Sequence, residues 1–141
     1  MAGVQVLSSP DVRVTELTAA ELGLTTTLVG GGEVVTLVER LPVGWGVRSV
    51  AVRRLGNITS ASGTVVLNIG TLEDTDHDNI VDELDLEGSG SEYLSPTVVR
   101  YDNDGPEPVE IVAQVVTATA APTAVAGLRI EVELVKIGRE N

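Results

Sequence analysis

Apolar and polar residues alternate with a period of two along much of the chain, which is the spacing of β-strands. From Leu128 to Leu134, Leu, Ile and Val alternate with Arg and Glu. One face of this segment meets a core and the other meets water, so it predicts a half-buried antiparallel strand. From Val109 to Val116 both alternating sets contain apolar residues, which predicts a strand covered on both faces. We expect these two strands to pair across the small-residue loop around Pro122.

The same alternation, interrupted by turn residues, predicts further short strands. They are Val4–Leu7, Val12–Thr15, Thr25–Val29, Glu33–Leu41, Trp45–Leu55, Gly63–Ile69 and Thr97–Tyr101. Gly30-Gly31-Gly32 supplies the conformational freedom of a tight hairpin. Thr18-Ala19-Ala20-Glu21 has capping-box spacing, but Gly23 limits it to about one turn. The pattern therefore predicts an all-β fold with almost no helix: an antiparallel β-sandwich of about eight strands.

Composition bounds the chemistry and the partners. The chain of 141 residues has no cysteine and one histidine, which excludes zinc fingers, thiol nucleophiles and disulfide frameworks. Its net charge of −12 repels phosphate backbones and anionic lipid, so we expect neither nucleic acid nor a membrane as partner. The length suits a single sandwich domain over residues 16–141, with residues 1–15 as an N-terminal arm or first strands.

An acidic segment carries the one candidate metal site. Glu73 to Glu92 contains nine acids, and no Lys or Arg occurs between Leu55 and Val99. Carboxylates recur at positions one, three, five, nine and twelve from Asp74, the spacing of a Ca²⁺ loop. Asn79 at position six tolerates the left-handed conformation that such a loop needs. The predicted ligands are Asp74, Asp76, Asp78, Asp82, Asp85 and the backbone carbonyl of Ile80.

The residues DTDHDNIVDELD resemble the calcium repeats of thrombospondin type 3 and related extracellular proteins. The resemblance covers this one copy, with Asn79 in place of the usual glycine and Asp85 in place of a longer glutamate. The resemblance implies that the cofactor is Ca²⁺. The alternative is a solvated acidic loop that binds no metal.

A wider resemblance runs from Val47 to Ile137. Ile69-Gly70-Thr71 at the end of a strand, the Asp-rich segment, and the small-residue turn before the last strand resemble jelly-roll decoration or cement proteins of tailed-virus capsids. The resemblance implies a jelly-roll-like sandwich that assembles as a homotrimer. It further implies that the protein binds the major capsid protein on the capsid surface of the virion.

Three further expectations concern function. We expect no enzyme, because the single histidine lies among carboxylates and aromatic residues are too few to hold a sugar. We find no export signal at the N-terminus, which favours a virion protein assembled in the host cytoplasm. The alternative is a Ca²⁺-dependent extracellular adhesion or carbohydrate-binding β-sandwich module.

Two residue groups are candidates for an interface. Arg40, Arg48, Arg53 and Arg54 concentrate four basic residues within 15 positions, and arginine pairs bidentately with carboxylates. They would also serve to protect a strand edge. Trp45, the single tryptophan, is either an interface anchor or core filling.

Overall fold

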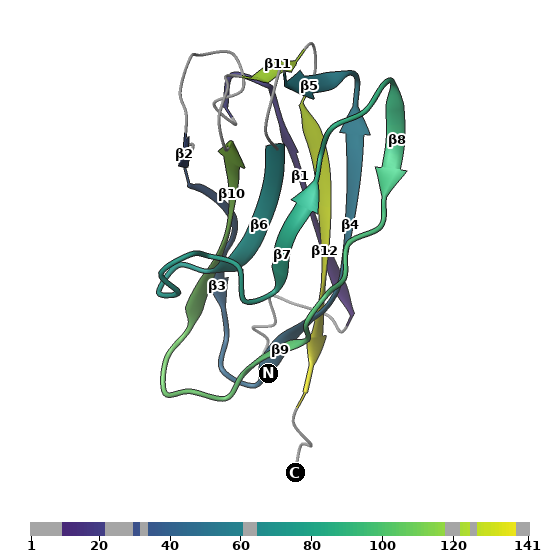
Figure 1. Cartoon of the computed structure of the whole chain (residues 1–141). Helices are drawn as coiled ribbons and strands as arrows, with labels where there is room; N and C mark the ends of the chain where they lie inside the picture. Colours follow the sequence, from purple (N-terminus) through teal and green to yellow (C-terminus); the bar gives the residue numbers. More distant parts are fainter. Residues whose placement is uncertain are drawn as a thin grey trace.

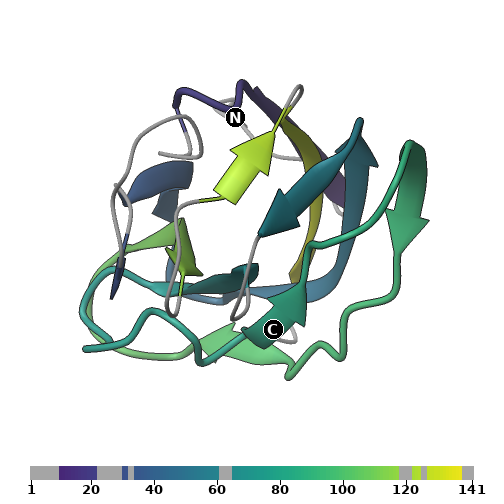
Figure 2. The same cartoon turned by 45° about the horizontal axis from the view of Figure 1, so that its top comes forward.

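The computed structural model describes residues 10–21, 30–31, 34–60, 65–117, 122–124 and 127–137. Two five-stranded antiparallel sheets pack face to face (Figure 1). Sheet A comprises β1 (Asp11–Leu17), β12 (Leu128–Lys136), β4 (Trp45–Leu55), β8 (Ser91–Leu94) and β9 (Tyr101–Asn103). Sheet B comprises β2 (Gly30–Gly31), β3 (Val35–Leu41), β10 (Val109–Thr117), β6 (Val65–Thr71) and β7 (Val81–Asp85). Figure 2 shows β5 (Ile58–Ser60) and β11 (Pro122–Ala124), which pair with each other, lying across one end of the sandwich.

The strand order is that of a jelly roll. β8 and β9 both pair with β4, and β2 and β3 both pair with β10, so each couple occupies one strand position. Eight positions result, paired first with eighth, second with seventh, third with sixth and fourth with fifth. The chain is thus a long ribbon that doubles back between β6 and β7 and curls into two sheets. This confirms the predicted antiparallel jelly-roll sandwich, and no helix occurs among the described residues.

The core lies between the two sheets and is aliphatic. On β12 the predicted alternation holds, because Leu128, Ile130, Val132 and Leu134 are buried while the residues between them are only partly covered. They face a layer from sheet B made of Leu67, Ile69, Ile111, Ala113 and Val115. Each fully buried side chain of this size contributes about 1.5–3 kcal/mol by leaving water. Trp45 packs against this core while remaining half-buried.

The expected pairing of the last two long strands is wrong. β10 lies in sheet B and β12 in sheet A, and β11, which lies between them in the sequence, crosses one end of the sandwich (Figure 2). Pro122–Ala124 form this strand rather than a loop, with Pro122 as its first residue, where proline is tolerated in a strand.

Two other local expectations concern the glycine run and a later strand. Gly30 and Gly31 pair with β10 as a short strand, whereas Gly32 and the strand expected before the glycines lie outside the described residues. The strand expected at Thr97–Tyr101 begins only at Tyr101, because Val98 makes a single bridge to Val81 of β7 instead.

The turn after β1 closes as its sequence predicts. The backbone N–H of Thr18 donates to the Glu21 carboxylate at 2.8 Å, and the N–H of Glu21 donates to Thr18 Oγ1 at 3.1 Å. This is the reciprocal pair of a capping box, made without a helix. Because β1 belongs to sheet A, residues 11–15 are part of the sandwich. The N-terminal arm or first strands predicted for residues 1–15 stay a prediction for residues 1–9, and Val4–Leu7 and Thr25–Val29 lie outside the described residues.

Candidate functional site

The acidic loop is the turn at which the ribbon doubles back. It connects β6 to β7 and extends sideways across sheet B, as Figure 1 shows. The backbone N–H of Leu72 donates to the carbonyl of Glu110 on β10 at 2.9 Å, which ties the start of the loop to the sheet. The start of the loop is therefore anchored to sheet B, while Glu73, Thr75 and Asp76 are exposed.

Gly70 and Asn79 hold the loop against β6. A Cβ atom at Gly70 would lie 2.3 Å from Asn79 Oδ1 and 2.6 Å from the His77 carbonyl carbon, so only glycine fits beneath the loop. Asn79 Oδ1 accepts a hydrogen bond from the N–H of Thr71 at 2.9 Å, and Asn79 Nδ2 donates to Thr71 Oγ1 at 3.3 Å. The Ile69-Gly70-Thr71 motif thus has a structural role, which is the close approach of strand and loop.

The left-handed residue of the loop is His77, with φ 52°, and not Asn79. The prediction for Asn79 is wrong because its amide is committed to Thr71 in a different backbone conformation. His77 Nδ1 lies 3.1 Å from the carbonyl oxygen of Thr71, and the ring is half-buried. The backbone N–H of His77 also donates to the carbonyl of Asp74 at 3.2 Å, closing the turn.

The six predicted calcium ligands are divided between loop and strand. Asp74, Asp76 and Asp78 lie in the loop, where Asp74 Oδ2 accepts from the N–H of Asp78 at 3.0 Å. Asp82 and Asp85 lie in β7, and Asp85 Oδ1 accepts from the N–H of Glu87 at 3.0 Å. The carbonyl of Ile80 accepts from the N–H of Val99 at 2.8 Å.

Three of the six groups, Asp74, Asp85 and the Ile80 carbonyl, therefore already have protein partners. Among the described residues, no three acidic or histidine side chains converge as a metal site would require. Calcium binding stays a prediction. It requires the carboxylates of the loop and of β7 to move closer together than they lie in this structure.

The loop and sheet B enclose a polar groove. It has a volume of about 410 Å³ and is lined by Asn68, Thr75, Asp76, Asp78, Glu83, Gln114 and Val116. Loss of solvent raises the pKa of Asp78, together with its contact to Asp74 and the charges of Asp82, Asp74 and Asp76. A bound cation would offset this repulsion, whereas an anion would increase it.

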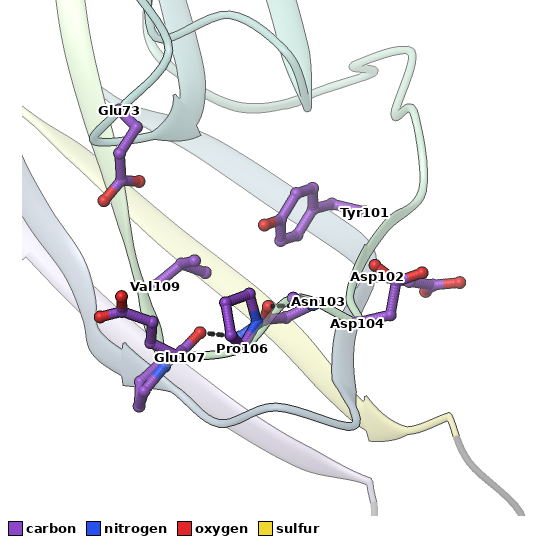
Figure 3. Close-up of a pocket in the computed structure, with 10 residues that line it drawn as sticks. Glu73, Tyr101, Asp102, Asn103, Asp104, Pro106, Glu107 and Val109 are labelled. Atoms are coloured by element: carbon purple, nitrogen blue, oxygen red, sulfur yellow. Dashed lines mark hydrogen bonds between the residues drawn. The ribbon is translucent and has the colours of Figure 1, made fainter.

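A second pocket opens at the end of the sandwich near the β9–β10 connection (Figure 3). It has a volume of about 430 Å³, and its lining includes the ring of Tyr101, Pro106 and Val109 with the carboxylates of Glu73 and Glu107. Desolvation, followed by the charges of Glu73 and Asp104, raises the pKa of the Tyr101 hydroxyl. Asn103 shapes the floor by donating to the carbonyls of Leu41 at 2.9 Å and Glu107 at 3.1 Å. Sequence periodicity missed this pocket because it joins the mostly irregular run 101–109 to Glu73, which comes from a separate part of the chain.

The four clustered arginines do not form one patch. Arg40 lies on β3 in sheet B, while Arg48 pairs with Glu133 on sheet A at 2.8 Å. The guanidinium of Arg53 stacks on the Tyr93 ring at 5.4 Å from its centroid. Arg54 points into the protein, with only 2% of its surface exposed.

Arg54 organises the segment that leads to β8. Its guanidinium donates to the carbonyls of Leu86, Glu87, Ser89 and Gly90 and pairs with Glu92 at 2.9 Å. Gly88 leaves room for this guanidinium, because the Cβ of any other residue at that position would lie within 2.6 Å of it. A signal for this burial was present in the sequence, since Val50, Val52 and Arg54 share the inward parity of β4.

Among the residues that the structure describes, no helix is long and apolar enough to cross a membrane. This finding concerns helices of the described part of the chain alone.

No protein-family model and no curated protein matches this chain. Among solved structures, it is similar to a chain of the "Cyanophage Pam1 capsid asymmetric unit", with a TM-score of 0.56 and 19% sequence identity. The similarity covers 96% of this chain and 90% of that chain. At this identity the comparison establishes a shared fold, the jelly-roll sandwich, over nearly the whole length of both chains.

Proposed function

We propose that this protein is a virion structural protein that decorates a viral capsid and stabilises it by bridging neighbouring capsid subunits. The observation that carries the proposal is the fold shared with a chain of a cyanophage capsid unit over 96% of the present chain. The Ile69-Gly70-Thr71 motif, one of the features behind the resemblance to decoration proteins, holds the acidic loop against β6.

The proposed partner is the major capsid protein, and the proposed location is the outer capsid surface of a virion assembled in the host cytoplasm. We further propose a homotrimer, the form that the family resemblance implies. Carboxylates line both pockets described above. Their negative charge suits contact with basic protein surfaces and opposes contact with nucleic acid.

The proposal is tested on capsid shells prepared with and without this protein. We expect added protein to saturate at a fixed ratio to the shell subunits, measured by co-sedimentation. Shells carrying it should survive heating and low ionic strength better than bare shells, since bridging contacts add to those within the shell. Equal survival of bare and decorated shells would contradict the stabilising role.

A second measurement separates this function from the alternative of a calcium-dependent adhesion module. Sedimentation equilibrium of the free protein should give three times the chain mass, and shell binding should persist in a calcium chelator. Shell binding that disappears with the chelator would favour calcium dependence over a simple structural role.

A further inference from the structure

β1 has its apolar side on the outside of the sandwich. Residues directly opposite each other on neighbouring strands share a face. Val12 and Val14 lie opposite Glu133 and Glu131, on the outer face of sheet A. They are 51% and 49% exposed, although valine favours the interior.

The first two inward residues of the same strand are charged. Asp11 and Arg13 lie opposite the buried Leu134 and Val132, yet they keep 28% and 43% of their side-chain surface exposed at the sandwich edge. They form an ion pair with each other at 2.8 Å. From Asp11 to Val14, β1 thus carries polar side chains inward and valines outward, while Leu17 at its end is buried in the core. Burial within its own sandwich does not explain the two exposed valines.

β1 is also the last strand of its sheet. Its one ladder is with β12, and no described strand pairs with its other edge. That edge is a row of backbone donors and acceptors that can template another strand. Exposed valines beside an open edge favour coverage by a second strand, which would extend sheet A and shield them.

Resting on the proposed function, we propose that β1 pairs antiparallel with β1 of a second copy, centred on Val12, and so links one trimer to the next on the capsid. Centring on Val12 places Val12 against its counterpart. It also places Asp11 of each copy directly opposite Arg13 of the other, giving two reciprocal ion pairs.

The other symmetric registers lack this complementarity. Centring on Arg13 puts like charges opposite each other, which destabilises a strand pair. Centring on Val14 puts Val12 opposite Glu16 and leaves Asp11 opposite Leu17. Centring on Thr15 puts Arg13 opposite Leu17 and Val14 opposite Glu16. Charge complementarity therefore selects both the occupant, a second copy, and the register.

Cysteine cross-linking of the full chain tests the contact, because the natural sequence contains no cysteine. Directly opposite Cβ atoms lie about 4.5–5.5 Å apart, close to the span of a disulfide. We expect Val12→Cys to form disulfide-linked pairs at least about ten-fold faster than Val43→Cys, a control on an exposed turn residue. Val14→Cys should be as slow as the control, since its counterpart lies about 13 Å away along the strand.

A charge exchange provides the second arm. Asp11→Arg alone should slow cross-linking of the Val12→Cys protein about ten-fold, and the double exchange Asp11→Arg with Arg13→Asp should restore it. A Val12→Cys rate equal to that of Val43→Cys, or a faster rate for Val14→Cys, would overturn the proposal. Cross-linking is carried out on protein bound to capsid shells, where trimers are neighbours, and co-sedimentation of the same samples measures decoration separately. Failed cross-linking of protein that still co-sediments would overturn the contact and leave shell decoration intact, whereas shells that bind no protein would overturn the function.

Discussion

At the scale of single residues, Arg54 and Arg53 show how adjacent residues of one type come to differ. Both are basic and lie in β4, but alternation sends Arg54 inward, where it is almost fully buried, and Arg53 onto the exposed ring of Tyr93. A buried guanidinium is tolerated here because backbone carbonyls and Glu92 accept its hydrogen bonds.

Arg54→Met should lower the free energy of unfolding by about 2–5 kcal/mol, since it leaves several inward carbonyls without a donor. Arg53→Met, the control next to it, should cost less than about 1 kcal/mol, because an exposed cation–π contact is weak. Chemical denaturation of both variants measures the difference. Similar losses in the two variants would contradict the role assigned to Arg54.

Glu133 gives a residue-scale prediction for pH. A hydrogen bond from Ser49 at 2.7 Å, and the bonds and charge of Arg48, lower the pKa of the Glu133 carboxyl. A lowered pKa in the folded state stabilises the protein above the unfolded-state value, and this stabilisation is lost as pH falls through the folded value. Ser49→Ala should move the pKa of Glu133 up toward its ordinary range, as followed by NMR of the carboxyl carbon. Ser91→Ala removes a hydroxyl that contacts Arg53 and should leave Glu133 unchanged.

At the scale of elements, the close approach of β6 and the acidic loop depends on Gly70. Gly70→Ala should destabilise the protein by about 1–3 kcal/mol, because the added Cβ meets backbone atoms of His77 and Asn79 as well as a side chain. Gly105→Ala is the matched control, since its nearest neighbour would lie 3.6 Å away, and we expect a change under about 1 kcal/mol. Thermal unfolding of the Gly70→Ala and Gly105→Ala proteins measures the difference. Equal stability of the two variants would contradict the close packing assigned to Gly70.

The predicted calcium site belongs to the same loop and remains open to test. Binding through Asp74, Asp76, Asp78, Ile80, Asp82 and Asp85 should give a calorimetric Kd of about 10⁻⁵ to 10⁻³ M. The double variant Asp76→Asn with Asp78→Asn should lose that heat. Asp102→Asn with Asp104→Asn makes the same charge change near the other pocket and should retain it. Equal or absent heats in the wild type and the loop variant would leave a loop that binds no calcium.

At the scale of the whole molecule, an excess of acids acts on every element at once. With 21 acidic against nine basic residues, the folded chain repels itself, and salt screens that repulsion over about 10 Å at 0.1 M. The midpoint of thermal unfolding should therefore rise by several degrees between about 0.01 and 0.5 M NaCl. A protein of near-zero net charge and similar size serves as the control. A midpoint that fell with salt would show that ion pairs such as Arg48–Glu133 outweigh the repulsion.

The alternating strands were determined by the sequence itself. From Leu128 to Leu134 in β12, each Leu, Ile or Val is separated from the next by one charged residue, and only one face of such a strand can be buried, so its core-facing residues follow without further information. The capping-box turn at Thr18 is equally local, because its two hydrogen bonds join residues three apart. The class of fold therefore follows from spacing along the chain.

Which strands pair, and what the polar residues contact, was decided only by the tertiary structure. β10 and β12 are adjacent long strands in the sequence yet lie in different sheets, since pairing depends on how the whole ribbon curls. The acidic spacing predicts a metal loop, but β6 draws Asp82 and Asp85 into a strand and Val99 takes the carbonyl of Ile80. Val12 and Val14 alternate as core residues do, and the register with β12 turns them outward. Alternation specifies that a strand has two faces, but the choice of the buried face depends on contacts between residues more than a hundred positions apart.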